Sequence, residues 1–162
     1  KEDPAKVKNA VTAEEVFRKI AEAKAIFVSR GDNSGTHVKE LYIWGKAGII
    51  PSSPWYIEVG KGMGEVLVMT DDKRGYTLTD NGTYLKYLEK ISLRPIFDKE
   101  SESLYNPYSI IAVNPARHPH VKYELAMSLI TWLTSPRGQT MIGNFKDKTG
   151  QVLFKTLAFP MK

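Results

Sequence analysis

The chain has 162 residues, 42% of them apolar and 25% charged, which is typical of a globular protein and excludes a disordered one. It contains no cysteine, which excludes disulfides, thiolate metal sites and cysteine nucleophiles. The net charge of +5 comes from cations scattered among acids, and no apolar run approaches the roughly 18 residues of a membrane span. Neither nucleic-acid binding nor a membrane span is therefore expected.

Strands and helices are expected to alternate along the first half of the chain. Thr12-Ala13-Glu14-Glu15 has the pattern of a helix capping box, and Val16, Phe17 and Ile20 follow at the spacing of one helix face. The expected elements of this half are a helix from 12 to about 23, a strand over 25–29, a helix ending near 47–48, a strand over 55–59 and a helix over about 65–71.

The second half continues this alternation. Residues 109–114 are strongly apolar and end before Pro115, a pattern that predicts a buried strand. The other expected elements are a strand over 75–79, a helix capped by Thr79 or Asp80, a strand over 93–97, a helix over about 123–133 and a short helix begun by Ser135-Pro136. This order favours an α/β fold with a mostly parallel sheet covered by helices.

A polar turn follows the first expected strand and has the features of an anion site. The first N–H groups of a helix lack carbonyl partners and lie at the positive end of the helix dipole. An oxyanion could be held by the amides of Ser34, Gly35 and Thr36, with Arg30 as charge partner. The hydroxyls of Ser29, Ser34 and Thr36 add further donors.

The charge of this helix start also favours an anion. His37 and Lys39 stand where a helix without a ligand usually carries Asp or Glu. Neither Ser34 nor Thr36 begins a capping box, because the residues three positions on are His37 and Lys39. The alternative is an ordinary Ser or Asn cap of the helix.

A second turn rich in glycine, Gly60-Lys61-Gly62-Met63-Gly64, also separates a strand from a helix; we call it the glycine turn. Glycine permits a close approach of main-chain N–H groups to a ligand, so Gly62 and Met63 are candidate ligand contacts. An ordinary turn is the alternative. The turn lacks the GxGxxG and GK[ST] patterns, so neither a dinucleotide nor a nucleoside triphosphate is indicated, and no cofactor is expected.

Two other chemistries find little support in the sequence. Ser29, Asp32 and His37 could form a hydrolytic triad, but no G-x-S-x-G pattern exposes the serine, and the chain is not expected to be an enzyme. His118 and His120 lie two residues apart without carboxylate or thiol partners, so no metal site is expected.

Several motifs spread over about residues 1–155 resemble those of one family, the solute-binding components of tungstate ABC importers, which are type II periplasmic binding proteins. The run from Arg30 to Thr36 is also similar to the arginine, aspartate and Ser-Gly-Thr by which phosphate-binding proteins hold their ligand. The motifs are Ser29-Arg30-Gly31-Asp32-Asn33-Ser34-Gly35-Thr36-His37, Trp55-Tyr56-Ile57-Glu58 with the glycine turn, Tyr76-Thr77-Leu78-Thr79-Asp80 with Gly82-Thr83-Tyr84, Tyr105-Asn106-Pro107-Tyr108, and Trp132-Leu133-Thr134-Ser135-Pro136.

The resemblance implies extracytoplasmic capture of a tetrahedral oxyanion, tungstate or molybdate, and its delivery to an ABC permease. It implies a periplasmic or extracellular location and allows a lipid anchor. The implied ligand-binding residues are Ser29, Arg30, Asp32, Ser34, Gly35, Thr36, Gly62 and Met63.

The family has two lobes, and the resemblance divides this chain between them. Residues 1–108 correspond to the second lobe, and residues 109–162 correspond to a crossover strand and helices that return to the first lobe. The family's N-terminal lobe, with its Thr-Thr-Thr-Ser motif, and its export signal have no counterpart, so the chain is expected to be a fragment. An apolar patch should then favour association with that lobe or with a second copy; its expected members are Ile110, Ile111, Leu129, Trp132 and Leu133.

The identity of the anion depends on the direction of the Asp32 carboxylate, which the sequence does not determine. A carboxylate that faces the ligand favours phosphate, which keeps a proton at neutral pH, whereas a carboxylate paired with Arg30 is compatible with tungstate. Another alternative of a different class is the anion-sensing effector domain of a transcriptional regulator, which shares this fold.

Overall fold

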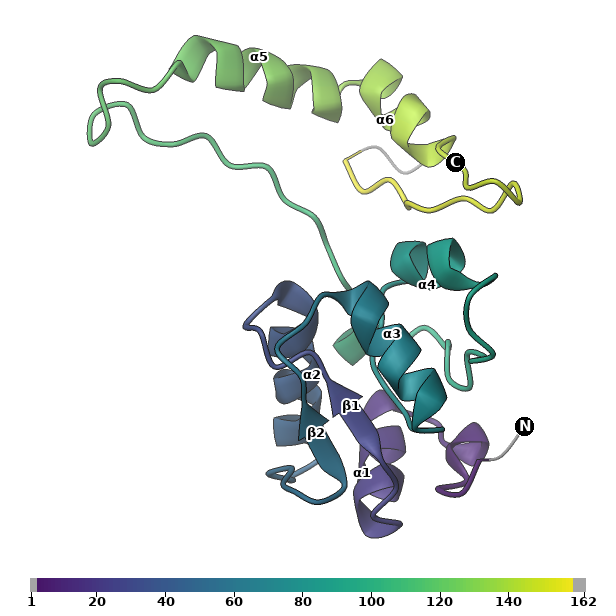
Figure 1. Ribbon diagram of the computed structural model, residues 1–162. Helices are drawn as coiled ribbons and strands as arrows, with labels where there is room; N and C mark the ends of the chain where they lie inside the picture. The colour runs from purple at the N-terminus through teal and green to yellow at the C-terminus, as the bar shows by residue number, and fades with distance from the viewer. Residues whose placement is uncertain (1–2, 159–162) are drawn as a thin grey trace. The chain divides into compact units, whose positions relative to one another are not determined.

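The computed structural model describes residues 3–158, which form two compact units that divide between Asn106 and Pro107 (Figure 1). The elements of the first unit are the short 3-10 helix η1 (Val7–Asn9), α1 (Ala13–Glu22), β1 (Phe27–Ser29), α2 (Gly35–Lys46), β2 (Tyr56–Glu58), α3 (Met63–Asp72), α4 (Asn81–Tyr87) and η2 (Glu102–Leu104). Those of the second unit are α5 (Tyr123–Thr134) and α6 (Pro136–Gly143).

The sheet of the first unit is small and parallel. β1 pairs with β2 so that Phe27 lies opposite Tyr56 and Ser29 opposite Glu58. On its other edge β1 pairs in parallel with a short segment at Tyr76: the Val28 N–H donates to the Tyr76 carbonyl and the Tyr76 N–H to the Ile26 carbonyl, both at 2.8 Å. The predicted parallel α/β class is confirmed.

Helices cover both faces of this sheet (Figure 1). Successive side chains of a strand point to opposite faces, and β1 is buried along its whole length. Phe27 packs on the α1 and α2 side, where its ring centroid lies 5.4 Å from that of Phe17 and 5.2 Å from that of Trp44. Val28 packs on the other side against Met63 and Leu67 of α3.

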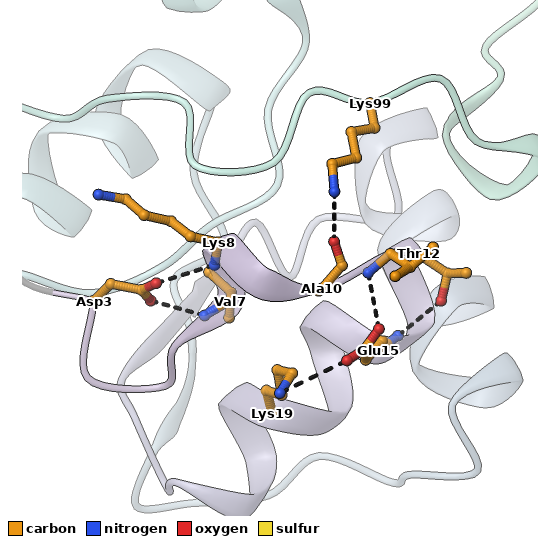
Figure 2. A network of polar contacts seen from close by, with 9 residues as sticks. Asp3, Val7, Lys8, Ala10, Thr12, Glu15, Lys19 and Lys99 are labelled. Atoms are coloured by element: carbon orange, nitrogen blue, oxygen red, sulfur yellow. Dashed lines mark hydrogen bonds and ion pairs between the residues drawn. The ribbon is translucent and has the colours of Figure 1, made fainter.

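The predicted capping box forms at the start of α1 (Figure 2). The Thr12 hydroxyl accepts the Glu15 N–H at 3.2 Å, and the Glu15 carboxylate accepts the N–H of Val11 at 2.8 Å, one residue before the cap. Figure 2 also shows the Asp3 carboxylate accepting the N–H groups of Val7 and Lys8, both at 3.0 Å. These side chains satisfy main-chain donors that helix geometry leaves free.

Three of the expected strands do not form as predicted. Residues 75–79 are reduced to the bridge at Tyr76, and 93–97 and 109–114 make no strand pairing with any residue the structure describes. The prediction for 109–114 rested on an apolar run, yet Ile111 is 84% exposed. An apolar run favours burial, but a strand also needs a neighbouring strand to pair its main-chain groups, and here none is supplied.

The helices of the second unit agree with prediction. Ser135 caps α6 by accepting the Gly138 N–H at 3.1 Å, and Pro136 occupies the first helical position. Several large apolar side chains of this unit are exposed: Ile110, Ile111, Leu125, Leu129 and Trp132. Within residues 3–158, every helix is too short or too polar to cross a bilayer.

Replacing Thr12 by Ala is expected to lower the free energy of unfolding of the first unit by about 1 kcal/mol, because the Glu15 N–H loses its acceptor. Thr12→Ser keeps the hydroxyl and should unfold like the parent. Urea unfolding followed by circular dichroism measures both, and equal destabilisation by the two variants would contradict the capping role.

Candidate functional site

The carboxyl ends of β1 and β2 bring the two predicted anion-binding turns side by side. The residues 30–36 that follow β1, which we call the anion turn, lead into α2, and the glycine turn leads into α3. The Val59 N–H donates to the Ser29 carbonyl at 3.2 Å and the Lys61 N–H to the Arg30 carbonyl at 3.3 Å. Ligands of parallel α/β sheets bind at this edge, so the pairing assembles a candidate site from both turns.

The anion turn ends at the N-terminus of α2, as predicted. Ser34 is the N-cap, and its hydroxyl accepts the His37 N–H at 3.4 Å. The N–H groups of Gly35 and Thr36 lie in the first turn, where the helix supplies no carbonyl. The sequence of this turn contains no acid, so its positive potential is not offset by the helix itself.

Asp32 is paired within the anion turn. Its Oδ2 accepts from Nε of Arg30 at 3.1 Å and from Nη2 at 2.5 Å, while its Oδ1 accepts the Ser34 N–H at 3.1 Å. Hydrogen bonds from the side chain and then the N–H of Ser34, together with Arg30, lower the pKa of Asp32 to about 2. The carboxylate is therefore ionised, and one of the three amides predicted to bind the ligand, that of Ser34, here donates to Asp32.

Ser29 lies inside the protein, where sequence reasoning expected a ligand-facing hydroxyl. The residue is fully buried, and its hydroxyl lies beside the side chains of Glu40 and Tyr56. Nearby, the buried carboxyl of Glu40 accepts from the Tyr56 hydroxyl at 2.8 Å and from Trp44 Nε1 at 3.2 Å. Burial raises the pKa of both Glu40 and Tyr56.

Sequence reasoning did not predict this polar cluster between α2 and the sheet. A signal was available, because Glu40 stands three and four residues before Ile43 and Trp44, which lie on the buried face of α2. An acid on an apolar helix face indicates a buried polar contact. Its partner Tyr56 comes from β2, and only the fold could identify it.

The glycine turn presents main-chain groups at Gly62 and Met63 and the exposed residue Lys61. Gly62 is the N-cap of α3, and the Met63 side chain is buried in the core with Val28, so its backbone is what remains at the turn. Beside this turn lies an open hollow of about 330 Å³. Its lining residues are Lys61, Gly64, Glu65, Val68, Met69 and Tyr87.

The remaining titratable residues form no metal centre in the part of the chain the structure describes. No three His, Asp or Glu side chains among residues 3–158 come together as ligands. His118 and His120 are both exposed, with ring centroids 6.2 Å apart.

Replacing Gly31 by Ala is expected to destabilise the first unit by more than the same change at Gly48. Both glycines have positive φ, +59° and +73°, where Ala costs about 1 kcal/mol. A Cβ on Gly31 would also lie 2.9 Å from Cβ of Glu58, whereas one on Gly48 would meet open space. Equal losses of unfolding free energy for the two variants would contradict the close approach of the anion turn to β2.

Asp32 should stabilise the folded chain in a pH-dependent way. Its folded pKa is depressed, so its contribution is present above the unfolded pKa of about 4 and is lost as the pH falls through about 2. The difference in urea midpoint between the parent and Asp32→Asn should therefore shrink from pH 5 to pH 2. A difference that stays constant across this range would contradict the Arg30–Asp32–Ser34 pairing.

Comparison with known proteins identifies the family. A family model described as a PBP superfamily domain matches residues 1–137. The tungstate-binding protein TupA of Peptoclostridium acidaminophilum is 41% identical over 155 residues, which cover 94% of this chain and 54% of that protein.

Solved structures agree with this assignment. The tungstate ABC transporter structure from Geobacter sulfurreducens has a TM-score of 0.77 and 48% identity, covering 88% of this chain and 60% of that one. The tungstate-binding protein TupA from Desulfovibrio alaskensis G20 has a TM-score of 0.75 and 42% identity, covering 93% and 62%. The chain spans about half the length of the curated relatives it matches. By the match over residues 1–137, the chain belongs to the PBP (periplasmic-binding-protein) superfamily.

Proposed function

We propose that this chain captures a tetrahedral oxyanion, tungstate or molybdate, for delivery to an ABC importer. The observation that carries the proposal is the anion turn, where Arg30 precedes a helix whose first turn contains no acid, at the carboxyl edge of the parallel sheet. The similar proteins are named as tungstate-binding proteins, and these names point to the same class of ligand.

The proposed contacts are charge-assisted hydrogen bonds. Arg30 supplies guanidinium donors, Gly35 and Thr36 supply main-chain N–H groups, and the Thr36 hydroxyl completes the anion turn. The Ser34 hydroxyl joins these donors when its proton turns from Asp32 to the ligand. The main chain of Gly62 and Met63 would approach from the glycine turn. Capture of this kind requires no covalent step, in keeping with relatives that are named as binding proteins.

The state of Asp32 supports tungstate or molybdate over phosphate. Phosphate keeps a proton at neutral pH and gains from a carboxylate that accepts it, whereas tungstate and molybdate carry none. The Asp32 oxygens are already occupied by Arg30 and the Ser34 N–H. Arg30 keeps donors for a ligand within this pair, because a guanidinium offers five N–H donors and the hydrogen bonds to Asp32 use Nε and Nη2.

The wider setting follows from the family. We infer that residues 1–108 act as the second lobe of a two-lobed binding protein and that residues 109–162 return to its first lobe, a division supported by the separation of compact units after Asn106. The exposed apolar side chains of the second unit, among them Leu129 and Trp132, would be covered there or by a second copy. An ABC permease as partner and a periplasmic or extracellular location belong to the same proposal.

Titration calorimetry with tungstate, molybdate, sulfate and phosphate tests the proposal. Tungstate and molybdate should bind more tightly than sulfate and phosphate. Arg30→Ala should weaken tungstate binding at least tenfold, because each charge-assisted bond contributes about 1.5 to 3 kcal/mol. Arg18→Ala, at an exposed position of α1, is the matched control and should bind like the parent.

A double variant separates two explanations of that loss. Arg30→Ala alone leaves the Asp32 carboxylate unpaired and able to repel the ligand. Arg30→Ala combined with Asp32→Asn removes this repulsion, so binding that stays weak assigns the loss to Arg30 itself. No heat with any of the four anions, or tungstate binding by Arg30→Ala as tight as in the parent, would contradict the proposed function.

A further inference from the structure

His37 occupies an unusual place for a residue at a helix start. It is the third residue of α2, yet it is only 5% exposed. Its Nδ1 accepts the main-chain N–H of Asn33 at 3.0 Å, and its Nε2 lies 3.8 Å from Oε1 of Glu58 on β2. Because a main-chain N–H can only donate, Nδ1 carries no proton, and the imidazole in this geometry is the neutral tautomer protonated at Nε2.

The residue held by His37 is one whose conformation needs support. Asn33 has a φ of +57°, in the left-handed region, which is sparsely populated but which Asn enters more readily than most L-residues. Immediately after it, the Ser34 N–H is held by Asp32. Two successive main-chain N–H groups at the centre of the anion turn are thus held by side chains: that of Asn33 by His37 and that of Ser34 by Asp32.

Nε2 of His37 lies beyond hydrogen-bond distance from its polar neighbour, the Glu58 carboxylate at 3.8 Å. It is a buried polar atom without a hydrogen-bond partner among the described residues, and such an atom carries a desolvation cost that an apolar side chain would avoid. The hydrogen bond that requires a ring nitrogen is the one that Nδ1 accepts from the Asn33 N–H in the anion turn.

We propose that His37 is the positioning residue of the anion turn. Its neutral imidazole accepts the Asn33 N–H at Nδ1, holds Asn33 in the left-handed conformation, and so sets the direction of the Gly35 and Thr36 N–H groups. This assignment rests on the proposed oxyanion function, but it concerns a residue that need not touch the ligand.

Two substitutions separate positioning from packing. His37→Leu fills a similar space with an apolar side chain and removes the acceptor; it should weaken tungstate binding roughly tenfold and lower the thermal midpoint by only the few degrees that one lost hydrogen bond accounts for. His37→Asn places an amide oxygen near the position of Nδ1 and should bind within about threefold of the parent. His118→Leu, at an exposed histidine, is the matched control and should change neither property.

Nitrogen NMR of the free 162-residue chain at pH 8 tests the proposal without any ligand. The His37 ring should show an unprotonated Nδ1 and a protonated Nε2, and the Asn33 amide should exchange with solvent faster in His37→Leu than in the parent and in His37→Asn. A proton on Nδ1 would overturn the proposal whether or not the variants fold. Asn33 exchange and tungstate affinity unchanged in His37→Leu would overturn it as well. If the parent binds no oxyanion, the proposed function fails, and the ring tautomer and Asn33 exchange alone decide the role of His37.

Discussion

The parallel pairing of β1 with β2 is the constraint on which the rest of the first unit depends. Each strand has only three residues, so the sheet owes its stability to helices packed on both faces. The pairing continues beyond Ser29 and Glu58 through the hydrogen bond from the Lys61 N–H to the Arg30 carbonyl. Because the strands run in the same direction, the turns that follow them meet at one edge, where two helices also begin.

Both apolar and polar side chains are buried on the face of the sheet that α2 covers. Phe27 and Trp44 build an aromatic core, and Glu40 accepts hydrogen bonds from Trp44 and Tyr56 at its margin. Ser29 is buried beside Glu40 and Tyr56, and His37 is buried with its Nε2 3.8 Å from the Glu58 carboxylate. Buried polar side chains thus gather directly behind the anion turn.

Local signals allowed the helices and the anion turn to be predicted from sequence. The Thr12 capping box and the Ser135-Pro136 start were predicted because helix ends depend on residues within three or four positions of one another. Asp80 was one of two candidate caps, and the Ser34 cap was the alternative to anion binding by that residue. The strand expected over 109–114 failed because pairing depends on a partner distant in the chain. For the same reason the buried hydrogen bond of Glu40 was not predicted, because its partner Tyr56 lies sixteen residues away on another element.

The sequence by itself determined which residues could hold an anion: Arg30, the Ser34 cap and an acid-free first turn are all local features. Only the tertiary structure decided how these groups are used. It paired Asp32 with Arg30 and the Ser34 N–H, placed Ser29 in the interior, and turned His37 towards β2 with its Nδ1 on the Asn33 N–H. The physical reason is that propensity and capping act over one helical turn, whereas side-chain direction and burial depend on what the rest of the fold packs against each residue.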